Sequence, residues 1–281
     1  MLLQQAVRLR PRAAESHNNL GLAHAGMGRF DEAEACYREA LRIDPGYVEA
    51  HNNLGSACKE RGRLEEALAC YRVALWHDPQ SASTRYNRSL ALLQSGDWPE
   101  GWREYEQRWK RKGVKERAFR RPRWDGSPLG GKTILLWCEQ GLGDAIHFVR
   151  HASQVKAKDG RVVLECPGFM VPLFSTCPGV DQLLAEGSEL PAFDVQAPLM
   201  SLPMLLGTTL ETVPAGAPYL SAEPGRVERW KARLDAIPGF KVGVAWQGNP
   251  LWVPKTSSAS TIKAKWTGGR DAAAGNETCR K

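Results

Sequence analysis

The chain has 281 residues, which suffices for one large domain or two ordinary ones at roughly 100–200 residues per domain. Its 42% hydrophobic and 25% charged residues are typical of globular proteins and exclude a wholly disordered chain. The excess of 38 Lys and Arg over 31 Asp and Glu gives a formal net charge of +7, which makes nucleic acid a candidate partner. No stretch approaches the roughly 20 apolar residues of a membrane-spanning helix, so we expect a cytoplasmic protein.

The positive charge is concentrated in one segment. Residues 103–123 hold ten Lys and Arg against three Glu, a local charge of +7, and the rest of the chain is neutral overall. The seven cysteines are odd in number and form no C-x-x-C pair, which indicates neither a disulfide framework nor a zinc site. We therefore expect reduced, mostly buried thiols.

The N-terminal part of the chain contains an internal repeat. Residues 16–49 match residues 50–83 at 18 of 34 positions when the sequence is shifted by 34. This shared frame resembles the tetratricopeptide repeat (TPR), in which each unit is a pair of antiparallel helices. We then expect the tight contact between the two helices at Leu20, Gly21 and Ala33. Gly28 is expected in the turn between them, and Pro45 is expected to end the second helix.

We predict a TPR array over residues 1–112, with repeats over 14–47 and 48–81, a diverged third unit over 82–112 and a partial unit over 1–13. The third unit carries an aromatic stripe at helical spacing, formed by Trp98, Trp102, Tyr105 and Trp109. We expect this stripe to be the buried face of the terminal repeat, and a platform on which bases stack is the alternative.

One repeated position is not explained by packing. Asn19, Asn53 and Asn87 recur at the same place on the first helix of all three units, although Asn is unfavourable inside helices. In TPR proteins this position faces the concave groove, and in O-GlcNAc transferase a similar asparagine ladder holds the backbone of a bound peptide. The resemblance implies that the groove binds an extended polypeptide, and inheritance by duplication is the alternative.

A basic run, KRKGVKERAFRRPRW, extends from Lys110 to Trp124. We predict a solvated linker over residues 113–131, with a patch for phosphate or for an acidic partner as the alternative.

The segment Gly126–Thr133 satisfies the P-loop pattern G-x-x-x-x-G-K-[ST]. A P-loop follows a buried strand and opens a helix, so that its amides cradle phosphates. Here the pattern precedes a predicted strand, Thr133–Cys138, and it therefore does not indicate nucleotide hydrolysis.

The segment 133–166 reads as a strand, a helical stretch over 145–158 and a second strand, Arg161–Cys166. Its glycine-rich turn sits at the carboxyl end of the first strand, where open α/β sheets place their ligands. Dinucleotide binding is disfavoured, because Ile146 replaces the third glycine of G-x-G-x-x-G.

Four segments of the second half together resemble a known family: CEQGLGDAIHF (138–148), PLMSLP (198–203), APYL (217–220) and KVGVAWQGNP (241–250). They are similar to bacterial TPR proteins that carry a GT-B glycosyltransferase module related to glycosyltransferase family 9, the heptosyltransferases. The resemblance implies a helical array followed by a Rossmann-like amino-terminal, acceptor-side domain over 132–240.

The resemblance also implies functional residues. Asp144 occupies the position of the acidic residue proposed as catalytic base in heptosyltransferases, and capping of the following helix is the alternative. Gly141, Leu142 and Gly143 would contact the acceptor, and His147 either orients it or is an ordinary partly buried histidine. No D-x-D pattern is present, so the implied sugar transfer from a nucleotide-sugar donor needs no metal cofactor.

In this architecture a second domain binds the donor, and residues 241–250 look like its first strand. The apolar-poor residues 251–281 are expected to be a disordered tail, so the chain is expected to be a truncated transferase of doubtful activity. The function predicted for the chain as it stands is protein binding by the repeats. A pure TPR scaffold and a nucleic-acid binder that uses the basic run are the alternatives.

Overall fold

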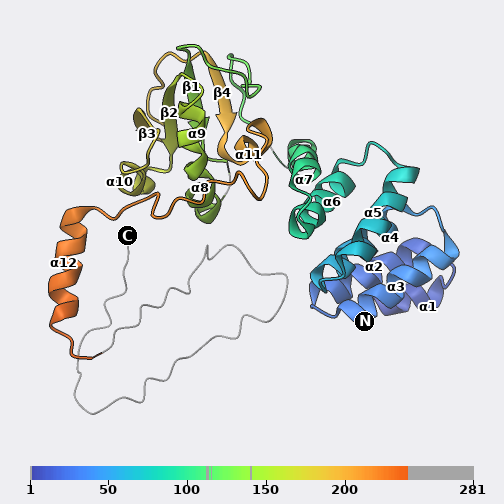
Figure 1. Cartoon of the computed structure of the whole chain (residues 1–281). Coiled ribbons are helices and arrows are strands. Elements are labelled where there is room, and N and C mark those ends of the chain that lie inside the picture. The colour runs from blue at the N-terminus through green and yellow to red at the C-terminus, as the bar shows by residue number, and fades with distance from the viewer. Residues whose placement is uncertain (1, 112–113, 115, 140, 240–281) are drawn as a thin grey trace.

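A computed structural model describes residues 2–111, 114, 116–139 and 141–239 (Figure 1). Within this part of the chain, a helical array is followed by a unit built on a parallel sheet (Figure 1). The predicted strand over 241–250 and the predicted tail over 251–281 lie outside the described residues. No helix in the described part is both long and apolar enough to cross a bilayer.

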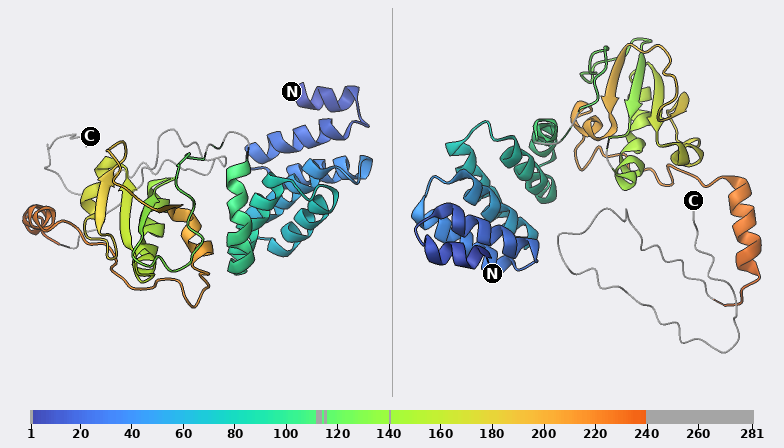
Figure 2. Two further views of the ribbon diagram at one scale, coloured as in Figure 1. Left: turned by 90° about the horizontal axis from the view of Figure 1, so that it is seen from above. Right: turned by 180° about the vertical axis from the view of Figure 1, so that it is seen from behind.

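The array consists of helices that pack in consecutive antiparallel pairs (Figure 2). Helix α2 packs on α3, α4 on α5 and α6 on α7, as the repeat frame predicts. The helices are α1 (Leu2–Leu9), α2 (Ala14–Gly26), α3 (Phe30–Ile43), α4 (Val48–Glu60), α5 (Leu64–His77), α6 (Ala82–Ser95), α7 (Trp98–Tyr105) and the 3₁₀ turn η1 (Glu106–Lys110).

The tight contact within each pair depends on a glycine facing a tyrosine. A Cβ atom at Gly55 would lie 2.8 Å from Cε1 of Tyr71, and one at Gly21 would lie 2.5 Å from Cε1 of Tyr37. Both tyrosines are fully buried. The array therefore needs a residue without a side chain where the first helix crosses the ring of the second.

Adjacent repeats are also joined by a recurring hydrogen bond at a proline carbonyl. The ring nitrogen Nε2 of His17 lies 2.9 Å from the carbonyl oxygen of Pro11, and Nε2 of His51 lies 2.8 Å from that of Pro45. In the third repeat Arg85 replaces histidine and donates to the carbonyl of Pro79. Each first helix thereby satisfies a carbonyl in the loop that precedes it.

The second unit is a four-stranded parallel sheet with the order β3-β2-β1-β4. The strands are β1 (Thr133–Trp137), β2 (Arg161–Cys166), β3 (Gln182–Ala185) and β4 (Val195–Pro198). The two central strands are almost entirely buried, as expected for a sheet covered on both faces. The coarse prediction of a helical array followed by an α/β unit is thus confirmed.

The connections of the sheet are short helices and 3₁₀ turns. They are α8 (Leu142–Phe148), η2 (Val149–His151), α9 (Ala152–Lys156), η3 (Gly168–Met170), α10 (Val171–Phe174), η4 (Leu199–Ser201), α11 (Leu202–Leu205) and the exposed α12 (Pro224–Asp235). The single helix expected over 145–158 is wrong in detail. It begins earlier, because Gly141 is its N-cap, and a 3₁₀ turn divides it.

The array and the sheet unit share one hydrophobic core. Tyr105 of α7 is buried in the same cluster as the strands β1 and β2, and Trp102 packs edge-on against both Tyr105 and Phe148 of α8. Trp109 lies against Trp137 of β1. The aromatic stripe predicted as the face of a terminal repeat is therefore the contact between the two units.

The segment predicted as a solvated linker is partly built into the fold. The backbone N–H of Trp124 donates to the carbonyl of Gln196 in β4 at 2.8 Å, and Trp124 is buried. Leu129 is buried as well. The chain thus runs along the free edge of β4 before it enters β1, which satisfies backbone groups that an edge strand would leave open.

Candidate functional site: the repeat groove and the strand-end network

The predicted ladder asparagines lie on α2, α4 and α6, the first helices of the three repeats, which contact one another in that order. Nδ2 of Asn53 donates to Oδ1 of Asn18 at 2.9 Å, and Nδ2 of Asn87 donates to Oδ1 of Asn52 at 2.9 Å. Each bond joins one repeat to the repeat before it. Asn19, on the first full repeat, is exposed.

These bonds leave hydrogen-bonding capacity on the ladder side chains. A side-chain amide has two N–H donors and an oxygen with two lone pairs. Within the described part of the chain, Asn53 and Asn87 each use one N–H for the bond between repeats. The hydrogen bonds that join the repeats therefore fix the orientation of the Asn53 and Asn87 amides, and each of these amides retains one N–H for another partner.

The glycine-rich turn lies at the carboxyl end of β1, as predicted. Gly141 is the N-cap of α8, and its carbonyl accepts the N–H of Ala145 at 3.0 Å. Gly141, Leu142 and Gly143 are exposed, and Asp144 is half-buried in the first turn of the helix. Asp144 is thus not the N-cap residue, although the helix dipole favours a carboxylate at its position.

His147 lies one turn after Asp144 and is exposed, with its ring edge-on to that of Phe148 at 5.0 Å between centroids. Desolvation against its neighbours and the positive charge of Arg150 lower the pKa of His147, and Asp144 acts in the opposite direction. These effects together favour the neutral form of the imidazole.

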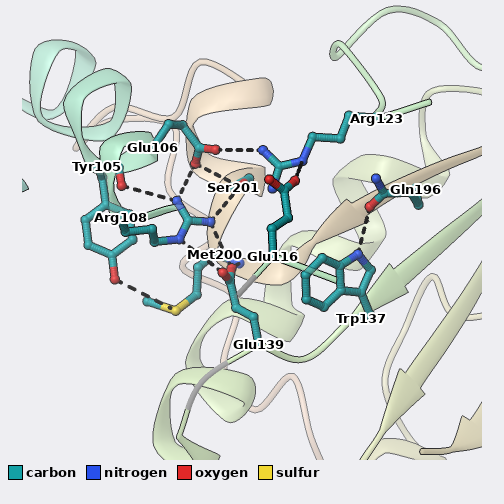
Figure 3. A network of polar contacts seen from close by, with 10 residues as sticks. All are labelled: Tyr105, Glu106, Arg108, Glu116, Arg123, Trp137, Glu139, Gln196, Met200 and Ser201. Atoms are coloured by element: carbon teal, nitrogen blue, oxygen red, sulfur yellow. Dashed lines mark hydrogen bonds and ion pairs between the residues drawn. The ribbon is translucent and has the colours of Figure 1, made fainter. Parts of the chain in front are cut away.

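A buried polar network that the sequence did not predict joins the two units (Figure 3). Its centre is the guanidinium of Arg108 in η1, whose side chain is 2% exposed. It pairs with both carboxyl oxygens of Glu139, each at 3.0 Å, and with Glu106 at 2.5 Å. Glu139 directly follows Cys138, so the network reaches the residues that lead into the glycine-rich turn.

The network is closed on the far side by the segment after β4. Nη2 of Arg108 donates to Oγ of Ser201 at 2.7 Å, and that hydroxyl donates to Glu106 at 2.8 Å. The N–H of Met200 donates to Glu139 at 3.1 Å. Burial raises the pKa of Glu139, and its bonds to Arg108 and Met200 oppose that rise.

Part of the basic run is neutralised by glutamates. Arg117 forms an ion pair with the buried Glu165 of β2, and Arg123 pairs with Glu106 and Glu116. Arg111 lies over the ring of Tyr86, with 4.1 Å from its guanidinium carbon to the ring centroid. These side chains hold the segment to the fold, which leaves fewer free cations for phosphate contacts than the sequence suggests.

The cysteines of the described residues are free thiols, and three of them, Cys58, Cys166 and Cys177, are buried. Burial raises the pKa of Cys138, next to the turn, to about 12, so this thiol is protonated at neutral pH and is no nucleophile. The described part of the chain contains no group of three or more His, Cys, Asp or Glu side chains that could hold a metal ion.

Comparisons with known proteins identify the repeats. Models described as tetratricopeptide repeat match residues 14–47 and 36–69, and a TPR repeat model matches residues 55–96. The chain is 31% identical over 191 residues to Protein FlbA of Caulobacter vibrioides (strain ATCC 19089 / CIP 103742 / CB 15). The aligned region covers 60% of this chain and 32% of FlbA. It therefore spans about a third of the length of this curated relative.

Among solved structures, the chain is similar to "First TPR of Spaghetti (RPAP3) bound to HSP90 peptide SRMEEVD". The sequence identity is 19% and the TM-score 0.35, over 37% of this chain and 84% of that one. The predicted TPR repeats are confirmed by the family models, and they imply a function in protein interaction. The glycosyltransferase resemblance of residues 132–240 stays a prediction.

Proposed function

We propose that this TPR array binds an extended peptide in its groove through the side chains of Asn19, Asn53 and Asn87. The observation that carries the proposal is the pair of bonds from Asn53 to Asn18 and from Asn87 to Asn52, which orient two of the three ladder amides and use one N–H of each. Amides that are fixed before binding lose little entropy when they bind main-chain groups of a peptide.

The triple variant N19A/N53A/N87A tests this proposal. Three lost hydrogen bonds at about 0.5–1.5 kcal/mol each correspond to a loss of about tenfold or more in affinity. A random peptide display library is selected on the wild-type chain, and the Kd of each selected peptide is measured by fluorescence anisotropy.

The matched control is N18A/N52A, which removes the acceptors of the bonds between repeats and keeps all three ladder amides. We expect this control to bind the selected peptides with a much smaller loss than the triple variant. Equal losses in the two variants would mean that the bonds between repeats, and not contacts of the ladder amides with the peptide, determine the affinity, and an unchanged Kd in the triple variant would contradict the proposal outright.

We further propose that the sheet unit is the acceptor-side domain of a metal-independent glycosyltransferase. The support is the parallel order β3-β2-β1-β4 together with an exposed glycine-rich turn at the end of β1 and Asp144 in the following helix. In this role Asp144 accepts the proton of the acceptor hydroxyl, Gly141, Leu142 and Gly143 contact the acceptor, and the neutral His147 orients it. The donor site belongs to a second domain, whose first strand would lie within 241–250, outside the described residues.

A nucleotide-sugar turnover assay with a panel of donors tests this second proposal. Any turnover should fall by about 10²–10⁴-fold in Asp144→Asn, because a general base contributes about that much. Glu189→Gln, an exposed carboxylate on the loop after β3, serves as the control. Turnover that survives in Asp144→Asn would exclude Asp144 as the base, and no turnover with any donor would contradict sugar transfer by this chain.

Nucleic-acid binding through the basic run is the remaining alternative. It would require an affinity that falls steeply with salt and depends on Lys110–Arg123. The ion pairs of Arg117 and Arg123 with glutamates argue against it.

A further inference from the structure

The parallel sheet has a topological switch point between β1 and β4. The chain proceeds from β1 to β2 and β3 on one side and then returns to the other side of β1 with β4. Open α/β sheets bind their ligands outside the carboxyl ends of the two strands at such a point. In this chain Glu139 follows β1 there, and Met200 and Ser201 follow β4.

This place is filled by a side chain of the repeat array (Figure 3). Nε and Nη2 of Arg108 donate to the two carboxyl oxygens of Glu139, each at 3.0 Å, in the paired geometry that guanidinium and carboxylate favour. Nη2 also donates to Ser201 at 2.7 Å. A ligand could reach the space between Glu139 and Ser201 only by displacing this guanidinium.

The surroundings of Arg108 satisfy a guanidinium completely. Besides the three bonds to Glu139 and Ser201, Nη1 donates to Glu106 at 2.5 Å and to the carbonyl of Tyr105 at 3.3 Å. These bonds match the five N–H donors of a guanidinium. Its guanidinium carbon also lies 4.8 Å and 4.6 Å from the ring centroids of Tyr105 and Trp109, on which its flat faces can stack.

We propose that the switch point of this sheet is a guanidinium-binding site and that Arg108 occupies it from within the same chain. The repeat array is thereby joined to the sheet unit at the position that comparable sheets reserve for a ligand. The site selects a planar, forked cation, because a lysine ammonium has three donors and cannot meet Glu139 and Ser201 in the same way. The proposal does not depend on peptide binding or sugar transfer.

Arg108→Ala tests the proposal, because it removes the guanidinium and leaves the Glu139 and Glu106 carboxylates around an empty position. Unfolding midpoints of this variant, of the wild type and of Arg103→Ala are compared in low-millimolar methylguanidinium chloride. Arg103 is an exposed arginine on the adjacent helix α7 and pairs with Glu100. Sodium chloride and methylammonium chloride at equal concentration serve as salt and charge controls.

Methylguanidinium should stabilise Arg108→Ala alone. At about ten times its Kd, a ligand that binds only the folded chain raises the ratio of folded to unfolded molecules about tenfold. Methylammonium should give no such rise, and the wild type and Arg103→Ala should not respond to either ion. No rise in Arg108→Ala, or an equal rise in Arg103→Ala, would overturn the proposal.

The test also holds for a variant that does not fold on its own. Arg108→Ala is then refolded from urea with methylguanidinium or methylammonium, and the yield of monomeric, cooperatively unfolding chain is measured. A yield recovered by methylguanidinium alone supports the site. Yields that are the same with the two ions contradict it.

Discussion

Replacing Glu139 by alanine is expected to lower the free energy of unfolding by about 3–5 kcal/mol. The side chain of Glu139 is 3% exposed and is the partner of the equally buried Arg108. Without Glu139, the buried guanidinium of Arg108 loses the acceptor of two of its N–H bonds, and Glu106 is left as its charged partner. A buried charge that loses a paired carboxylate in this way is strongly destabilising, because water cannot replace the missing acceptor. Equilibrium urea unfolding, followed by circular dichroism, measures the loss.

The matched control is Glu100→Ala. Glu100 pairs with Arg103 of α7, whose side chain is 68% exposed, and lies 3.6 Å from the guanidinium of Arg88. Ion pairs that water can reach contribute about 1 kcal/mol or less. Glu139→Gln adds a second comparison, because it keeps the shape of the side chain and one acceptor oxygen. A loss in Glu139→Ala no larger than that in Glu100→Ala would show that the pair does not hold the two units together.

The repeats could be predicted from the sequence because their contacts are local and periodic. Gly55 and Tyr71 face each other within one helix pair, and the same two residue types recur at Gly21 and Tyr37. The same structural role therefore recurs at equivalent positions of two repeats, and this recurrence can be recognised in the sequence. Strands β1 and β2 could also be predicted, because buried parallel strands are continuous apolar runs.

The strand-end network could not be predicted in this way. Arg108 lies just before the basic run, within the charge-rich segment 103–123, and its partners Glu139 and Ser201 are 31 and 93 residues away. Nothing periodic connects these positions. Only the folding of the array onto the sheet reveals that Arg108 is the buried arginine of segment 103–123.

The asparagines show a subtler limit. The repeat period of 34 aligns Asn19 with Asn53 and Asn87, but the hydrogen bonds connect positions 35 apart, from Asn53 to Asn18 and from Asn87 to Asn52. The adjacent asparagine of each Asn-Asn pair, which the period alone left without a role, is the acceptor. The side chains of Asn53 and Asn87 are thus positioned by Asn18 and Asn52, which occupy a different repeat position from the ladder asparagines.

Replacing Gly126 by alanine is expected to cost about 2–5 kcal/mol. Gly126 is the first residue of the segment that satisfies the P-loop pattern, but the segment precedes β1 and Gly126 has another reason to be glycine. Its φ of +89° lies in the left-handed region, where any other L-residue is destabilised by about 1–2 kcal/mol. In addition, a Cβ atom at this position would lie 2.2 Å from the carbonyl oxygen of Leu205. That atom belongs to the backbone, so the strain cannot be relieved by a change of rotamer, and overpacking adds about 1–3 kcal/mol.

Gly130→Ala separates the two contributions to that cost. Gly130 belongs to the same segment and has a φ of +55°, but a Cβ atom there would meet nothing within 4 Å. Its loss, measured by the same urea unfolding experiment, therefore reports the conformational cost alone, and the excess in Gly126→Ala reports the clash with Leu205. Equal losses at the two positions would mean that the chain between Trp124 and β1 can move away from α11, which contradicts its close packing against that helix.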